Sequence, residues 1–299
     1  MNASAVSKRK APPPKTKHVK NSLWMLAIPL YACTLVLVVL PLFYVLGVSF
    51  LKNDGMLGAE GPVTLENYAM LLDPTYLRTF LDSLVLAFAT TAITIAAGYP
   101  FGYLMAKLPP KKGGLVLMAV MIPFWTNALV RIYGWKIFLR ADGVVNTVLQ
   151  GLGVIDEPLK LLYTYGAVLV GMVYSLLPFM ILPVYNSVQK MDWSLVEAAR
   201  DLGASRARAF LTVTLPRTLP GLLSGVVLVF VPSIGLFFLS DILGGAKIML
   251  VGNLIRNEML NARDLPFAAA LAVVMMVMTM LILLLYRKVT HAQELEGLA

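Results

Sequence analysis

Charged residues and cysteine are both scarce in this sequence. Asp, Glu, Lys and Arg make up 14% of the 299 residues, while 59% are hydrophobic. A soluble domain carries roughly a quarter of its residues as charged side chains to keep its surface hydrated. The composition therefore excludes an ordinary soluble protein and indicates a surface that faces lipid. Cys33 is the single cysteine, which excludes an internal disulfide.

Motifs for catalysis and nucleotide binding are also missing. The chain has no G-x-x-x-x-G-K-[ST] phosphate loop, and Gly244-Gly-Ala-Lys247 is too short to form one. It has no Ser-His-Asp, dinucleotide-binding or metal-ligand pattern, and its two histidines stand near opposite ends. We therefore expect no catalytic residues, no metal site and no bound cofactor: this polypeptide is not an enzyme by itself.

Long apolar runs are what the chain has in abundance. A helix of about 20 apolar residues crosses the hydrocarbon core of a bilayer. Six runs reach this length, which predicts an all-α membrane protein with six transmembrane helices. They are Leu23–Phe50, Thr79–Ala106, Leu115–Phe138, Leu162–Tyr185, Leu219–Leu243 and Pro266–Tyr286.

The net charge of +9 is distributed as expected for a membrane protein with both termini in the cytoplasm. Short cytoplasmic loops are enriched in Lys and Arg, and this orientation places 16 of the 25 basic residues inside and 11 of the 16 acidic residues outside. We predict a disordered basic cytoplasmic tail at 1–21, a transmembrane domain at 22–288 and a cytoplasmic C-terminal tail at 289–299. This charge pattern suits a membrane and does not predict nucleic-acid binding.

The cytoplasmic loop 186–218 is too regular for a simple connector. Ser194 and Glu197 form a capping-box pattern that predicts the start of a helix, and apolar residues follow at helical spacing. Gly203 should end this helix, and a second amphipathic piece should run from Ser205 to Pro216, which ends it. We expect a short helical hairpin that fits a groove of another protein; the alternative is an amphipathic connector on the membrane surface.

Two pairs of glycines lie within the apolar runs. Gly98 and Gly102, and likewise Gly221 and Gly225, have the G-x-x-x-G spacing. This spacing allows the backbones of two membrane helices to approach closely. We therefore expect tight helix packing at both pairs.

The loop resembles the EAA loop of permeases from ATP-binding-cassette (ABC) importers. The family pattern is Glu-Ala-Ala, three residues, Gly, nine residues, an aliphatic residue, any residue, Leu-Pro. The matching residues here are Glu197, Ala198, Ala199, Gly203, Val213, Leu215 and Pro216, with Val in place of the more usual Ile. The resemblance implies a type I importer permease (MetI-like) fold whose cytoplasmic coupling helix docks on a separate ATPase subunit and relays its closure to the membrane helices.

Beyond this loop, nearly the whole chain after residue 20 resembles the B-type permeases of bacterial spermidine/putrescine importers. The similar segments include Pro123-Phe-Trp-Thr-Asn127, Arg131-Ile-Tyr-Gly-Trp135, Leu176-Leu-Pro-Phe-Met180 and Ser240-Asp241. The resemblance implies import of polyamines by alternating access in the bacterial inner membrane. The implied partners are a homologous second permease subunit, two ATPase subunits that bind ATP and Mg, and a periplasmic polyamine-binding protein.

A polyamine path needs a few carboxylates and aromatic faces to replace water around the ammonium groups. Asp82 and Asp241 are the acids placed closest to the membrane interior, where an ionised residue is a functional candidate. For Asp241 the alternatives are a helix cap or a salt bridge to Lys247, and for Asp82 an interaction with the helix dipole. The aromatic candidates, for which anchoring at the membrane interface is the alternative, are Trp125, Tyr133, Trp135 and Tyr174.

Three other functions compete with this one. An ABC permease for another small solute would share the coupling loop. A six-helix secondary transporter should carry ionisable residues at mid-membrane and no cytoplasmic hairpin. An intramembrane enzyme would need a reactive pair at one depth, and the sequence shows none.

Overall fold

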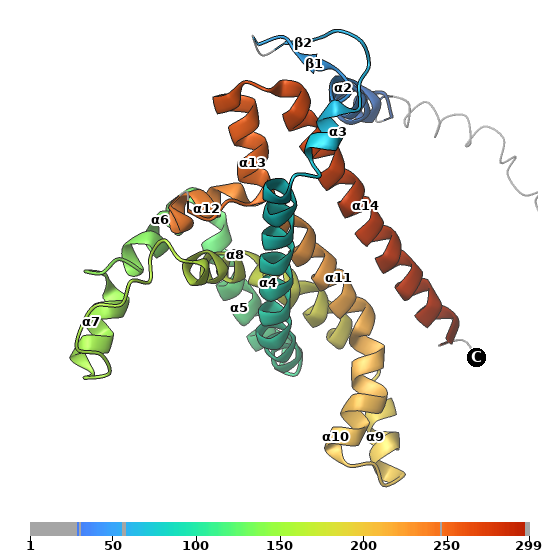
Figure 1. The fold of residues 1–299 in the computed structure, drawn as a ribbon. Helices are drawn as coiled ribbons and strands as arrows, with labels where there is room; N and C mark the ends of the chain where they lie inside the picture. The colour runs from blue at the N-terminus through green and yellow to red at the C-terminus, as the bar shows by residue number, and fades with distance from the viewer. Residues whose placement is uncertain (1–28, 30, 56–57, 246, 297–299) are drawn as a thin grey trace, which may run out of the picture.

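The computed structural model describes residues 29, 31–55, 58–245 and 247–296, which form helices and one short β-hairpin (Figure 1). Apolar segments adopt helices because a helix satisfies its own backbone hydrogen bonds in the absence of water. The helices are α2 (Leu40–Val48), α3 (Glu66–Met70), α4 (Pro74–Ala106), α5 (Pro110–Met121), α6 (Ala128–Phe138), α7 (Val144–Gly151), α8 (Tyr165–Gln189), α9 (Ser194–Asp201), α10 (Arg206–Ala209), α11 (Leu215–Gly235), α12 (Phe237–Gly244), α13 (Val251–Asn257) and α14 (Leu265–Glu296).

Shorter elements join these helices. Strands β1 (Lys52–Asn53) and β2 (Ala59–Glu60) pair antiparallel. A 3-10 turn, η2 (Ile122–Trp125), follows α5. The π-helical turns are η1 (Leu35–Val39), η3 (Phe210–Thr214) and η4 (Glu258–Ala262).

Within the described residues, five helices are long and apolar enough to cross a membrane, and a bent pair brings the number to six if it is counted as one span. Its two parts, Lys111–Trp125 and Ala128–Phe138, meet at 92°. The expectation of one continuous third helix is therefore wrong. The helix breaks because Thr126 is extended, and the side chain of Asn127 then caps α6 by accepting a hydrogen bond of 2.8 Å from the backbone N–H of Leu129.

The fifth span also differs from the expectation. A continuous helix runs from Arg206 to Gly235, so Pro216 does not end a helix as expected. Pro216 comes directly after the π-helical turn η3, where the backbone hydrogen-bond pattern already departs from that of an α-helix. Leu236 leaves the helical conformation after Gly235, and the chain resumes as α12.

Helix α8 forms the centre of the bundle and packs against both α4 and α11. Met180 of α8 is fully buried between two glycines of the neighbouring helices. A Cβ on Gly98 would lie 2.8 Å from Met180 Cγ, and a Cβ on Gly225 would lie 2.6 Å from Met180 Sδ. The expected close packing at both glycine pairs is confirmed, because Gly102 and Gly221 also approach the α8 backbone.

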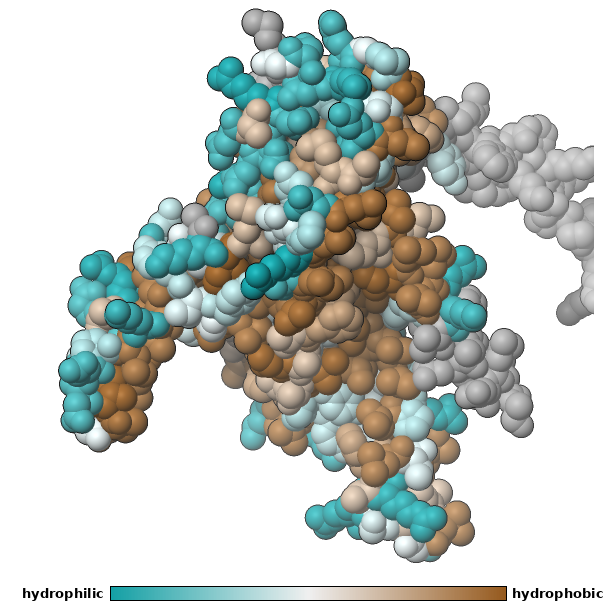
Figure 2. Space-filling model, in the orientation of Figure 1, coloured by the Kyte–Doolittle hydropathy of each residue, from teal (hydrophilic) through white to brown (hydrophobic). Residues whose placement is uncertain are grey.

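Polar and apolar surfaces are separated along the bundle. Figure 2 shows a brown, hydrophobic belt around the middle, with hydrophilic residues above it and on the α9–α10 hairpin below. Figure 1 places that hairpin at the end of the molecule opposite the β-hairpin and α13. The expected tail 1–21 lies outside the described residues, and α14 continues past Lys288 to Glu296. The cytoplasmic location of both termini stays a prediction.

Candidate functional site

The loop between α8 and α11 forms the expected helical hairpin. Helix α9 begins at Ser194, as predicted, but the prediction of a capping box between Ser194 and Glu197 is wrong, because the N-cap residue is Trp193, whose side chain makes no capping hydrogen bond. Asp192 instead accepts a hydrogen bond of 3.0 Å from the backbone N–H of Ser194. Hydrogen bonds from the side chain and the backbone of Ser194 lower the pKa of Asp192 below its ordinary value. Asp192 therefore stabilises the start of α9 as a carboxylate.

Gly203 makes the turn after α9 and has a φ of +89°. L-residues rarely adopt this conformation, which explains the glycine. Apart from Gly203 and its two chain neighbours, no heavy atom of the described residues lies within 4 Å of the position a Cβ would take. Glycine is therefore needed here for its backbone conformation and not for space inside the chain.

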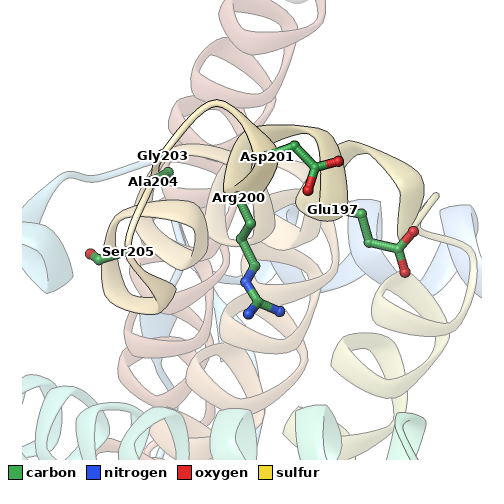
Figure 3. A pocket seen from close by; sticks show the side chains of 6 residues that line it. All are labelled: Glu197, Arg200, Asp201, Gly203, Ala204 and Ser205. Atoms are coloured by element: carbon green, nitrogen blue, oxygen red, sulfur yellow. The ribbon is translucent and has the colours of Figure 1, made fainter.

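An exposed groove of about 450 Å³ surrounds this turn. Figure 3 shows Gly203 and Ala204 at the turn, with the side chains of Arg200 and Asp201 pointing away from each other. The neighbouring Leu202 is 90% exposed. The lining residues are Glu197, Arg200, Asp201, Gly203, Ala204 and Ser205.

The structure brings part of the expected coupling residues together. Glu197 and Gly203 line the groove, and Ala198 and Ala199 lie on the same short helix α9. Leu215 and Pro216 lie beyond it, at the start of α11. The α10 half of the hairpin is continuous with α11 through η3.

An aromatic cluster that the sequence analysis missed joins the hairpin to α4. Tyr103 of α4 lies 6.2 Å from Trp193, which precedes α9, and 5.7 Å from Phe210 of η3, measured between ring centroids. The Lys107 Nζ lies 4.3 Å from the Tyr103 centroid and 5.1 Å from the Trp193 centroid. The hydroxyls of Tyr99 and Thr218 lie 2.8 Å apart and link α4 to α11. In the sequence, this aromatic cluster is indicated only by the four-residue spacing of Tyr99, Tyr103 and Lys107, which places the three residues on one face of α4.

Asp241 lies on α12, and each of its two carboxylate oxygens contacts a side chain of α13. Its Oδ1 accepts a hydrogen bond of 2.6 Å from Asn253 Nδ2, and its Oδ2 pairs with the guanidinium of Arg256. The partner of Asp241 is therefore Arg256 and not Lys247. The sequence analysis missed both Asn253 and Arg256, because the two residues lie 12 and 15 positions further along the chain.

Asp82 lies apart from Asp241, in a cavity of about 380 Å³ that Arg78 and Tyr165 also line. Helix α4 begins at Pro74, earlier than expected, and Asp82 is in its third turn. The N-cap is Asp73, which accepts a hydrogen bond of 2.8 Å from the Thr75 backbone N–H. The interaction with the helix dipole fades within the first turn, so Asp82 is too far from the start of α4 to make it. Asp73 is the acidic residue that stands at that start.

The aromatic candidates fall into two groups. Trp135 and Tyr174 pack together with ring centroids 5.5 Å apart and line a groove of about 590 Å³ between α6, α7 and α8. Trp125 is 85% exposed and Tyr133 53% exposed on the bent span. The structure therefore brings together two of the four.

Among the described residues, no group of three or more His, Cys, Asp or Glu could hold a metal ion. The arrangement offers an exposed turn at one end of the molecule, and separate carboxylates and aromatic rings along the helices.

The comparisons with known proteins agree with this geometry. Residues 22–292 match the family model described as binding-protein-dependent transport system inner membrane component. The chain is 47% identical over 249 residues to the spermidine/putrescine transport system permease protein PotB of Escherichia coli, covering 83% of this chain and 90% of that protein. It is 45% identical over 249 residues to the protein of the same name from Haemophilus influenzae, covering 83% and 87%.

Solved structures show the same fold at low sequence identity. A bacterial ABC transporter involved in the import of the acidic polysaccharide alginate has a chain with a TM-score of 0.75 and 16% identity, covering 92% of this chain and 98% of that one. An inward-facing form of the MetNI methionine ABC transporter has a TM-score of 0.55 and 18% identity, covering 76% and 98%. The MetI-like fold is thereby confirmed, and the chain belongs to the family of inner membrane permease components of binding-protein-dependent ABC transport systems.

Proposed function

We propose that this chain is the permease subunit of an ATP-driven importer of polyamines such as spermidine and putrescine. The observation that carries the cargo assignment is the identity of 45–47% over 83% of the chain with permeases named for spermidine/putrescine transport. At this level the resemblance extends through the membrane helices and is not limited to the coupling loop that all cargo classes share. The exposed hairpin supports the requirement for a separate ATPase.

The proposed complex contains this chain, a homologous second permease, two ATPase subunits that bind ATP and Mg, and a periplasmic polyamine-binding protein. ATP binding closes the ATPase dimer, and its movement pushes on the groove around Gly203. Because the helix from Arg206 is continuous to Gly235, this push is passed on to α11. The cavity between the two permeases then opens outward to receive cargo, and hydrolysis returns it to the inward-facing state.

Polyamine cargo suits the sparse polar groups of the proposed path. An ammonium group gains about 0.5–2 kcal/mol from each aromatic face that replaces water. Trp135 and Tyr174 offer such faces on one groove, and Trp125 and Tyr133 offer exposed rings nearby in the sequence. We propose that the carboxylate of Asp82 contacts cargo in its cavity. Asp241 contacts cargo only when its ion pair with Arg256 opens.

The test is the ATPase activity of the complete complex in lipid nanodiscs. We expect the spermidine-loaded binding protein to stimulate hydrolysis more than the empty protein does. Stimulation by a binding protein loaded with an unrelated solute, and not by the polyamine-loaded one, would refute the cargo and leave the family assignment intact.

A further inference from the structure

A second pocket, of about 560 Å³, lies between the end of α4 and the α9–α10 hairpin. Three basic residues from separate segments line it: Lys107 after α4, Arg200 of α9 and Arg206 of α10. Glu197 is the one acidic residue among its lining side chains. The lining therefore carries a net charge of about two positive units, which attracts anions.

The three basic side chains have no counter-ion in the described part of the chain. No carboxylate there lies within ion-pair distance of Lys107, Arg200 or Arg206. The ammonium of Lys107 is instead held by ring faces, at 4.3 Å from the Tyr103 centroid and 5.1 Å from the Trp193 centroid. Such contacts position the ammonium without cancelling its charge. Guanidinium and ammonium donors thus remain available to an anion in the pocket.

The residue types in the pocket fit a phosphate group that is attached to an apolar body. The planar guanidinium of Arg binds phosphate through two N–H groups at once, and the ammonium of Lys binds it as a point charge. The apolar part of the wall comes from Ala106 and Phe210, together with the Tyr103 ring. A small inorganic anion would use the basic side chains and leave this apolar wall uncovered.

The position of the pocket along the bundle points to a lipid. The membrane-spanning part of α4 ends at Ala106, and Lys107 is the next residue. The pocket therefore begins where the hydrocarbon-crossing segment stops, which is the level of the phospholipid headgroups. Basic pockets of this kind, beside membrane helices on the cytoplasmic side, bind the headgroups of anionic lipids.

The pocket is separate from the groove around the docking turn. Figure 1 shows the α9–α10 hairpin extending beyond the end of α4. Gly203 lines the groove at its tip, whereas Lys107 and Arg206 line the pocket alone. Only Glu197 and Arg200 line both. A ligand between the hairpin and α4 therefore leaves the turn at Gly203 open to the ATPase.

We infer that the pocket binds the phosphate group of an anionic phospholipid through Lys107, Arg200 and Arg206. The inference rests on the proposed function in one respect: the hairpin faces the ATPase, so the lipid belongs to the cytoplasmic leaflet. The lipid ties the hairpin to the bilayer surface beside the aromatic cluster of Tyr103 and Trp193. The lipid composition of that leaflet then affects how far a movement of the hairpin reaches α4.

Photo-crosslinking tests this in the complete complex, reconstituted in nanodiscs of phosphatidylcholine. The probe is a phosphatidylglycerol with a photoreactive diazirine in its headgroup, added as a minor component. We expect adducts in the segments 103–107 or 193–200, identified by mass spectrometry. Absence of adducts in these segments, with labelling only along the lipid-facing sides of the membrane helices, would overturn the inference.

Substitutions show whether the basic side chains hold the lipid. Lys107→Gln combined with Arg206→Gln should lower the adduct yield in these segments roughly twentyfold, because each basic residue near the surface contributes about a factor of five to binding. Lys107→Arg combined with Arg206→Lys keeps both charges and should retain the adduct. The matched control is Arg208→Gln, which lies on α10 outside the pocket and should leave the yield unchanged. Equal yields from the neutral and the charge-preserving pairs would contradict the inference.

Two further arms exclude other occupants of the pocket. Inorganic phosphate in excess should lower the adduct yield no more than sodium chloride of the same ionic strength; a selective loss with phosphate would assign the pocket to a soluble anion. The adduct should also form equally in the permease pair without the ATPase, and its loss when the ATPase is added would assign the pocket to that subunit. Either loss would overturn the lipid assignment. The crosslink does not depend on cargo, so import of another solute would refute the polyamine proposal alone, and polyamine uptake without the adduct would refute this inference alone.

Discussion

Substitutions of Gly203 distinguish two effects on ATPase binding: the backbone conformation of the turn, and steric contact between the turn and the ATPase. The residue has a φ of +89°, and a Cβ there would meet no atom within 4 Å from the described part of the chain beyond the two neighbouring residues. Forcing an L-residue into a left-handed conformation costs roughly 1–2 kcal/mol. This cost reduces the population of the native turn by a factor of about 5–30. Gly203→Ala should therefore weaken ATPase association by about this factor through backbone strain.

Gly203→Asn provides the matched comparison. Asn adopts positive φ more readily than Ala does, so its backbone strain is smaller, but its side chain is larger. If backbone shape alone matters, the Asn variant should bind the ATPase better than the Ala variant. If the partner lies against the turn, as the account requires, the Asn variant should bind worse, and Gly203→Asp worse still.

The assay is the affinity of the detergent-solubilised permease pair for the ATPase, with the thermal stability of the free permeases measured alongside. The free permeases should differ little among the variants, because the turn is exposed. Normal ATPase binding and normal coupled transport by Gly203→Asp would refute the assignment of this hairpin as the docking element.

Four further predictions follow from the contacts described above. Trp193→Ala should leave basal ATP hydrolysis intact but reduce its stimulation by the loaded binding protein, since each aromatic contact contributes about 0.5–1.5 kcal/mol. Trp193→Phe should retain most of the stimulation. Equal stimulation of the two variants would contradict a role for the aromatic cluster. Gly225→Ala should destabilise the bundle by about 1–3 kcal/mol through a clash with the central helix, measured as a lower Tm. Asp241→Asn and Arg256→Gln should each cost about 1 kcal/mol, given a partly exposed pair, and the double variant no more than either; additive losses in Tm would rule out the pair. Burial, and secondly the charge of Asp264, raises the pKa of Glu258 above its ordinary 4.5, so the charged form is disfavoured in the folded state. Glu258→Gln should therefore raise the Tm near pH 7, and this gain should disappear below about pH 4.5, where the unfolded chain is also protonated. A gain in Tm that does not depend on pH would contradict this.

The sequence predicts the features that depend on local pattern. Apolar runs locate the five long helices and the bent pair, because crossing the hydrocarbon core takes about 20 apolar residues. The positive-φ turn at Gly203 and the close approach of Gly98 and Gly225 to the central helix were likewise predictable. In each case the residue type is limited by the backbone around it.

The features that were missed depend on contacts between distant segments or on small differences in backbone preference. The bend near Asn127 lies inside an apolar run that is long enough for one continuous span. Pro216 was expected to end a helix, but the helix continues through it after the π-helical turn η3. Tyr103 and Phe210 are more than 100 positions apart and meet only because α4 and the hairpin pack together. Arg131 is an ordinary basic residue in the sequence, and its Nε and Nη1 atoms are buried only because of how α6 packs.

Uptake by reconstituted proteoliposomes tests the central claim most directly. The vesicles contain this chain, the second permease and the ATPase, with ATP enclosed, and labelled spermidine or putrescine is added outside with the binding protein. The account predicts accumulation that requires both ATP and the binding protein and that Gly203→Asp abolishes. Accumulation that continues without ATP, or an ATP-dependent complex that moves another solute and leaves polyamines outside, would contradict it.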